Sequence, residues 1–392
     1  MNDFKLSAKG LRLVGISGLI VAVLVSSCDG LFGPLGAQKP EEVISALPTQ
    51  VSYPPDNPYT EEKEILGRLL YWDPILSGTQ EVACVSCHHP DLGYADGLGF
   101  SQGVGGVGLG PNRVGGELTR RNAPTVINTA FNGIDNDGIY DPQSAPMFWD
   151  NRAESLEGQA LLPMLSKEEM RGEAIAEGAI IDTLLMRLKA IPEYVEKFEA
   201  VFGSDGINQR NLLAAIATFE RGIVANNSRF DLYMRGDESA LSALEIEGMN
   251  AFIEVGCADC HSGPMFSDYE LHTIGVKDNV TQPDDGATQS FDFRTPTLRN
   301  LNLTAPYMHN GLHETLEEVM EFYEEVAGGD SDQRNVNVAQ SQLDEEMLDL
   351  DLDDEQIDGI IAFMEALNDD DFDRTVPERV PSGLPVGGNI EQ

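Results

Sequence analysis

Basic residues are scarce in this chain: 25 Lys and Arg stand against 66 Asp and Glu, so the formal net charge is −41 over 392 residues. Nucleic-acid binding is excluded, because phosphate contacts require clustered Lys and Arg, and electrostatic docking on anionic lipid is disfavoured. Five cysteines are too few for a disulfide-rich secreted scaffold. Wholesale disorder is also excluded, because 41% of the residues are hydrophobic.

The N-terminus has the features of an export signal. Basic residues precede an apolar stretch over Leu13–Val25, which is short for a membrane span and ends at Ser26-Ser27-Cys28. This end resembles a bacterial lipobox, in which the cysteine is lipidated. Residues 1–27 are therefore predicted to be a lipoprotein signal peptide and Cys28 the lipidated residue, which places the protein on the periplasmic side of a bacterial membrane. An ordinary cleaved signal is the alternative.

Composition divides the rest of the chain. Residues 28–58 are rich in Pro and Gly and lack a helical period, so we expect a tether. The same composition in 376–392 predicts a disordered tail. Between them we expect an N-terminal domain over 59–236 and a C-terminal domain over 237–375.

Two Cys-x-x-Cys-His motifs carry the strongest chemical signal. They are Cys84-Val85-Ser86-Cys87-His88 and Cys257-Ala258-Asp259-Cys260-His261, and this pattern is the attachment motif of c-type haem. Each thiol bonds to one vinyl group of the porphyrin, and the histidine supplies the proximal nitrogen to iron. A zinc ribbon normally separates its cysteine pairs by about 15–20 residues, far fewer than here. A redox dithiol needs no following histidine.

Apolar residues recur at helical spacing around both motifs, and strand patterns are scarce. A capping box begins at Thr315. The sequence therefore predicts a mainly α protein with two cytochrome c-like domains, each binding one covalent c-type haem. We expect helices over Thr60–Leu70, Asp182–Val201, Asn211–Asn226, Ser242–Glu254 and Gln356–Leu367.

Further motifs resemble the bacterial dihaem cytochrome c peroxidase family, including its MauG-type branch, over about Asn57 to Asn368. They are Arg121–Asn128, Phe148-Trp149-Asp150, Phe219-Glu220-Arg221, Arg294–Asn300 and Tyr307–Gly311. The resemblance implies that the first haem meets hydrogen peroxide and that the second stores or relays electrons. It also implies that Trp149 lies between the two haems.

The resemblance further implies a peroxide pocket and a calcium site. Gln159 and Glu169 fall where the family has its peroxide-pocket glutamine and its acid–base glutamate, with Pro163 beside the pocket. A carboxylate can move the proton that peroxide cleavage requires from one oxygen to the other. The positions that match the ligands of one calcium ion between the haems are Asn122, Thr304 and Pro306, and their oxygen atoms suit a hard cation. The acidic insertion Gly133–Met147 departs from the family.

The first iron is predicted to be open. Ordinary family peroxidases carry a distal histidine on the loop after the first motif, but no histidine occurs between His89 and His261, and Gly97–Gly116 is rich in glycine. His89 adjoins the proximal ligand and cannot reach the opposite face. A methionine ligand, Met147 or Met164, is the alternative.

At the second haem, the family's axial methionine position falls on Tyr323, which is the MauG-type arrangement. Met320, one turn earlier on the same helical face, is the rival ligand, and a packed tyrosine with no iron bond is the third interpretation. Phenolate favours high oxidation states of iron, whereas methionine raises the potential.

These features favour a dihaem oxidoreductase that uses hydrogen peroxide at an open first haem, with electrons from an external donor relayed through the second. The donor could be a protein substrate. One alternative is a peroxide-scavenging peroxidase fed by a small cytochrome or cupredoxin, and another is a non-catalytic dihaem carrier. The acidity either steers a basic donor or forms a solvated surface with no particular partner. The membrane contact would be the lipid anchor alone.

Overall fold

The structure is a computed structural model that describes residues 40–279 and 281–391. The predicted signal peptide and Cys28 lie outside the described residues. Within them, no helix combines the length and the apolar character needed to cross a membrane.

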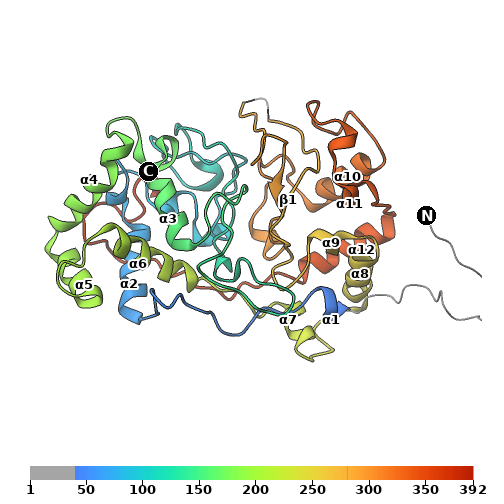
Figure 1. Cartoon of the computed structure of the whole chain (residues 1–392), viewed down its shortest axis with the longest axis horizontal. Helices are drawn as coiled ribbons and strands as arrows, with labels where there is room; N and C mark the ends of the chain where they lie inside the picture. The colour runs from blue at the N-terminus through green and yellow to red at the C-terminus, as the bar shows by residue number, and fades with distance from the viewer. Residues whose placement is uncertain (1–39, 280, 392) are drawn as a thin grey trace, which may run out of the picture. The chain divides into compact units, whose positions relative to one another are not determined.

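The described chain is mainly helical, as predicted (Figure 1). One short antiparallel pair, β1 (Leu271–His272) with β2 (Phe293–Arg294), is the sheet of this part of the chain. The helices are α1 (Pro40–Val43), α2 (Glu61–Trp72), α3 (Leu156–Leu165), α4 (Glu177–Lys189), α5 (Pro192–Phe202), α6 (Gln209–Arg221), α7 (Arg229–Met234), α8 (Ala243–Glu254), α9 (Cys257–Cys260), α10 (Leu316–Ala327), α11 (Glu345–Leu348) and α12 (Asp354–Glu365).

Local signals explain where these helices begin and end. The Thr60 side chain accepts a hydrogen bond from the Lys63 amide and caps α2. The single helix expected over Asp182–Val201 is two helices, because Pro192 lacks the amide hydrogen that a continuous helix needs and instead begins α5. Thr315 caps α10 as predicted. The box is incomplete, since the Glu318 carboxylate accepts from the Glu314 amide.

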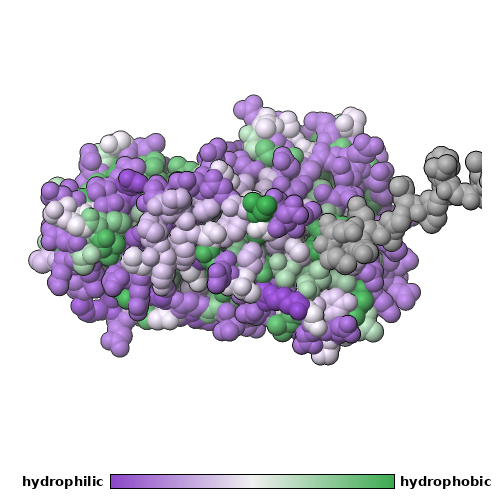
Figure 2. All heavy atoms as spheres, turned by 60° about the horizontal axis from the view of Figure 1, so that its bottom comes forward, coloured by the Kyte–Doolittle hydropathy of each residue, from purple (hydrophilic) through white to green (hydrophobic). Residues whose placement is uncertain are grey.

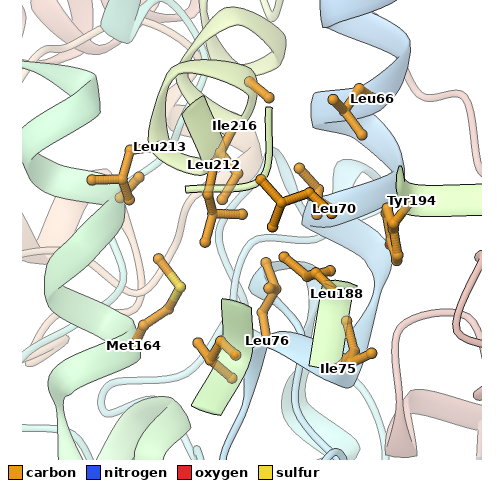
Figure 3. Close-up of a cluster of buried hydrophobic side chains, with 14 of the residues drawn as sticks. Leu66, Leu70, Ile75, Leu76, Met164, Leu188, Tyr194, Leu212, Leu213 and Ile216 are labelled. Carbon is orange, nitrogen blue, oxygen red and sulfur yellow. The ribbon is translucent and has the colours of Figure 1, made fainter. Parts of the chain in front are cut away.

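The N-terminal domain packs α2 against α6. A Cβ placed on Gly67 of α2 would lie 2.0 Å from the Ala215 carbonyl oxygen, so only glycine permits this crossing. Leu66, Leu70, Leu212 and Ile216 come from these two helices and point into one core (Figure 3). This core supports one side of the cavity that holds the first motif.

The C-terminal domain is built around α8 and α12. Its core holds an aromatic cluster in which Phe230, Phe252, Phe266 and Phe363 meet with ring centroids 5.2–6.1 Å apart. Phe230 belongs to α7, so α7 packs with the second domain. The boundary at 236/237 stays a prediction; in the structure, α7 contributes Phe230, Tyr233 and Met234 to the core around α8 and α12.

The predicted tether and tail also differ from the structure. From Pro40 onward the chain packs against the second domain: Ile44 and Leu47 are buried, and the Leu47 amide donates to Asp231 Oδ1 at 2.9 Å. Near the other end Val380 is buried, and Ser382 Oγ donates to Asp73 Oδ1 at 2.7 Å. Because both segments are rich in Pro and Gly, their composition did not indicate that these few apolar residues are buried.

Hydrophilic residues dominate the face shown in Figure 2, with small hydrophobic spots among them. This surface agrees with the excess of acidic residues in the sequence. Charge of one sign keeps a protein soluble and steers oppositely charged partners, without determining its fold.

Candidate haem sites

The first motif forms one wall of a cavity in the N-terminal domain. Cys84, Cys87 and His88 line it together, and the His88 amide donates to the Cys84 carbonyl at 3.0 Å. His88 Nδ1 lies 3.1 Å from the Tyr94 carbonyl oxygen. A carbonyl only accepts, so Nδ1 carries the proton and Nε2 keeps a free lone pair. Burial also lowers the pKa of His88, which keeps the ring neutral.

The second motif repeats this arrangement in the C-terminal domain. Cys257, Cys260 and His261 line a second cavity. His261 Nδ1 lies 3.0 Å from the Phe266 carbonyl oxygen, and burial lowers the pKa of this histidine as well. The two proximal histidines therefore share one tautomer and one kind of partner, as metal-ligating histidines usually do.

These donor sets fit covalent haem and not zinc. All four motif cysteines are free of disulfides. They lie in pairs in two different cavities, so they do not surround one ion as the cysteines of a zinc ribbon do. Arg294 adds a second indication: it lines both cavities, and its buried Nε lacks a hydrogen-bond partner among the described residues. A buried cation of this kind suits the carboxylates of a haem.

Trp149 lies in the wall between the two cavities and lines both of them. Its indole Nε1 donates to the Asn122 carbonyl at 3.0 Å, and its own carbonyl accepts from the Arg294 amide at 2.8 Å. Each bond ties the tryptophan to a residue that also lines both cavities. Trp72, the other tryptophan, is buried against His89 and lines neither.

Gln159, Pro163 and Glu169 all line the first cavity. Gln159 and Pro163 belong to α3, and Glu169 to the π-helical segment Lys167–Arg171, whose start Ser166 caps. Burial raises the pKa of Glu169, and Arg152 opposes this increase in part. The structure therefore brings the predicted glutamine and glutamate to the same cavity as the first motif.

The glycine-rich loop passes close to this glutamate. A Cβ on Gly103 would lie 2.0 Å from the Glu168 carbonyl oxygen. The Val104 amide donates to the same carbonyl at 3.0 Å. Glycine in this loop thus allows its backbone to pack directly against the segment that carries Glu169.

The cavity wall contains few candidates for a second iron ligand. Among the described residues that line the first cavity, His88 is the single histidine. His89 packs edge-on against Trp72, with ring centroids 5.7 Å apart. Met147 and Met164 do line the cavity, but Met147 Sδ accepts from Asn132 Nδ2 at 3.5 Å and Met164 is buried in the hydrophobic core.

Both candidate ligands of the second haem come from α10. Tyr323 and Met320 line the second cavity. Met320 is buried in the core around α8 and α12, whereas Tyr323 contacts a separate small cluster and packs edge-on against Phe322. Burial and the nearby Cys257 and Cys260 raise the pKa of the Tyr323 phenol.

The predicted calcium ligands lie at the junction of the domains. Asn122, Thr304 and Pro306 all line the second cavity, and Asn122 lines the first as well. The Asn122 amide group approaches the Pro306 carbonyl oxygen, with Nδ2 at 3.3 Å. The Asn122 backbone amide also donates to the His309 carbonyl at 2.8 Å. Asn122 therefore connects the two domains through a backbone hydrogen bond.

Sequence reasoning gave no role to two buried residues of the cavities. His309 lines the second cavity, stacks on Phe293 with ring centroids 3.7 Å apart, and has its pKa lowered to about 3 by burial. Glu220 lines the first cavity from α6. Both lie in motifs that carried the family resemblance, but spacing alone did not indicate that they face a cavity.

Known proteins are similar to this chain over most of its length. The family model of the di-haem cytochrome c peroxidases matches residues 61–239. Methylamine utilization protein MauG of Methylorubrum extorquens is 33% identical, over 91% of this chain and 94% of its own. Cytochrome c551 peroxidase of Nitrosomonas europaea is 30% identical, over 93% and 95%.

Solved structures are similar to this chain as well. The crystal structure of a MauG-like protein associated with microbial copper homeostasis superposes with a TM-score of 0.67 at 29% identity, over 82% of this chain and 95% of that one. The diheme peroxidase BthA of Burkholderia thailandensis, at 19% identity and a TM-score of 0.63, shares the fold. The chain therefore belongs to the di-haem cytochrome c peroxidase family and is a haem-dependent oxidoreductase.

Proposed function

We propose that the protein uses hydrogen peroxide as oxidant at an open first haem and takes electrons from an external donor through the second. One observation carries this proposal: the first cavity combines Gln159 and Glu169 with a single histidine, His88, among its described lining residues. An electron carrier keeps both axial positions of its iron filled, whereas a peroxidase needs one position free. When bound, the haem iron supplies the site where peroxide binds and is reduced.

Glu169 would move the proton. Peroxide cleavage requires a proton to leave the oxygen nearer the iron and to join the farther one, and a carboxylate within reach can accept and then donate it. Burial raises the pKa of Glu169, which makes it a stronger base than an exposed carboxylate. Gln159, in the same cavity, would orient the peroxide by hydrogen bonding.

Trp149 would carry the second oxidising equivalent toward the second haem. Its place in the wall of both cavities and the two hydrogen bonds that fix it support this role. No tryptophan follows Trp149 in the sequence. Transfer beyond the second haem would therefore use a tyrosine or the haem edge itself, which leaves a specific MauG-type protein substrate as one option beside a small cytochrome or cupredoxin.

Tyr323 is proposed to supply a ligand to the iron of the second haem. Tyr323 and Met320 both line the cavity, and Met320 is more deeply engaged in the hydrophobic core. Iron would bind the phenolate, so ligation must overcome the raised pKa of the free phenol through the charge of the metal. Phenolate ligation would favour the high oxidation states that peroxide produces.

A calcium ion between the haems is the third proposed feature. The amide nitrogen and oxygen of Asn122 can be exchanged without changing its shape. That exchange gives up the Nδ2 hydrogen bonds to the Leu98 and Pro306 carbonyls and places Oδ1 beside both carbonyl oxygens, where Thr304 also lines the cavity wall. Such oxygen atoms suit calcium. Because Asn122 joins the two domains, the ion would fix the spacing of the haems.

The protein is further proposed to act on the periplasmic side of a bacterial membrane, with Cys28 as its lipid anchor. This position would agree with the predicted export signal and with covalent haem attachment, which takes place outside the inner membrane. The physiological role would be either oxidation of a partner or removal of peroxide.

Rapid mixing of the fully ferric protein with one equivalent of peroxide tests the proposal. An open first iron predicts fast spectral changes at both haems without prior reduction. If the ferric protein is inert and reacts only after one-electron reduction, a residue occupies the first iron and the reductively activated peroxidase is the better account. If it reacts in neither state, the protein is a carrier.

A further inference from the structure

A buried carboxyl group without a partner faces the first-haem cavity. Glu220 lies in the last turn of α6, is 5% exposed, and lines the cavity together with Cys84 and Ile216. Its Oε2 atom is fully buried and has no hydrogen-bond partner among the described residues. Buried carboxylates are normally paired, because an unpaired buried charge is costly.

The neighbouring cation Arg221 lowers the pKa of Glu220 in part, but it makes its ion pair with another carboxylate. Arg221 donates to both carboxylate oxygens of Glu157, at 2.5 and 2.7 Å, and this pair forms a fork between α6 and α3. Glu157 therefore adds negative charge near Glu220, and it also accepts the hydrogen bonds of two guanidinium nitrogens of Arg221. Glu220 lies in the last turn of α6, and the C-terminal end of a helix carries partial negative charge. This charge disfavours the ionised form of the Glu220 carboxyl.

The remaining titratable groups around Glu220 do not neutralise it. Tyr71 of α2 donates its hydroxyl to the His88 carbonyl, and the Cys84 thiol is neutral. Two cations of α2 also lie close to α6, and each has other partners. Lys63 donates to Asn57 and Pro58, whereas Arg68 pairs with Glu64 and Asp373. Burial raises the pKa of Glu220 to about 8 in this setting.

We propose that Glu220 is a proton-binding positioning residue of the first haem, which takes up a proton when this haem is reduced and releases it when the haem is oxidised. Reduction adds one electron to the ferric haem and removes one positive charge beside the cavity. The carboxylate then becomes easier to protonate, and a proton from solvent forms the O–H bond of the neutral acid. Oxidation reverses both changes.

Coupling of this kind has a definite sign. Between the pKa of Glu220 with oxidised haem and its higher pKa with reduced haem, the midpoint potential must fall as pH rises, because reduction then consumes a proton. Outside that pH interval, Glu220 contributes no pH dependence to the midpoint potential. The inference needs a bound first haem and does not depend on peroxide chemistry, so it can fail while the proposed function stands.

Redox titration of the two-haem protein between pH 5 and 10, without peroxide, tests the inference. One haem of the wild type should show a potential that falls with pH over part of this range, and Glu220→Gln should abolish that dependence. Glu220→Asp should keep it at a shifted pH. Glu199→Gln, the same substitution at an exposed site on α5, should behave as the wild type.

Infrared difference spectra between the reduced and oxidised protein provide a second measurement. The wild type should gain the carbonyl stretch of a protonated carboxyl on reduction, and Glu220→Asp should shift that band. This comparison remains decisive if Glu220→Gln fails to fold. A pH-independent wild-type potential, a dependence retained in Glu220→Gln, or a band unchanged in Glu220→Asp would overturn the inference.

Discussion

In the first domain the proximal Nδ1 lies 3.1 Å from a backbone carbonyl, and in the second domain the equivalent distance is 3.0 Å. The two cavities differ in the residues that line the rest of their walls. The first contains Gln159 and Glu169, whereas the second contains Tyr323 and Met320. Because the two motifs are alike and the other lining residues differ, we expect these other residues to give each haem its own chemistry.

The largest effect is expected from a substitution in the first cavity. Glu169→Gln keeps the shape and removes the proton acceptor, so the rate constant for peroxide should fall by about 100- to 10,000-fold. In the wild type this rate should also decline as pH drops below the raised pKa of Glu169, because the protonated acid cannot accept a proton. The variant should lose that decline.

Glu168→Gln is the matched control, because Glu168 is the exposed neighbour in the same segment and does not line the first cavity. It should change the peroxide rate by less than about twofold, given the small effect of most surface substitutions. Equal losses in both variants would assign the effect to the segment and not to proton transfer.

The next prediction concerns Trp149, which lines both cavities. Trp149→Phe removes the bond to the Asn122 carbonyl and the indole itself. Peroxide should still react at the first haem, while the spectral change at the second should slow markedly in stopped-flow traces. Trp72→Phe removes an indole outside both cavities and should leave the two changes coupled. Coupled changes in Trp149→Phe would remove the tryptophan from the electron path.

A third prediction sharpens the description of the second cavity. Tyr323→Phe should eliminate the low-spin EPR signal of a His–Tyr haem, while Met320→Leu, which nearly conserves volume, should leave it in place. The opposite pattern would make Met320 the ligand. If neither variant changes the signal, Tyr323 is a packed residue of α10.

The sequence predicted most helices and the two Cys-x-x-Cys-His motifs that line the cavities, because short motifs and caps act locally. Thr60 and Thr315 begin helices as expected. The packed ends of the chain escaped prediction, since Ile44 and Val380 are single apolar residues whose contacts lie far away in the sequence. The gathering of Gln159 and Glu169 in one cavity came from family resemblance, because no periodic pattern relates an α3 residue to a π-helical one.

Calcium removal tests whether the two domains act as a pair. Chelation should lower turnover several-fold and alter the spectra of both haems, because Asn122 contacts the walls of both cavities. Adding calcium should restore both properties, and magnesium should do so poorly, since it requires a smaller octahedral site. Full activity after verified calcium removal would contradict a structural ion.

The smallest expected effect concerns the surface of the second domain. Residues 311–370 contain 20 Asp and Glu but one basic residue, Arg334. Electron transfer from a basic cytochrome should therefore slow with rising ionic strength, because salt screens its attraction to these carboxylates. An uncharged reductant should show no such dependence. A basic donor insensitive to salt would mean that this acidity serves solubility alone.

The EPR spectrum of the fully ferric protein tests the central contrast most directly. An open first iron and an occupied second iron predict one high-spin and one low-spin haem in equal amounts in a single chain. Two low-spin haems with no high-spin component would show that a protein residue also occupies the first iron and would contradict the account.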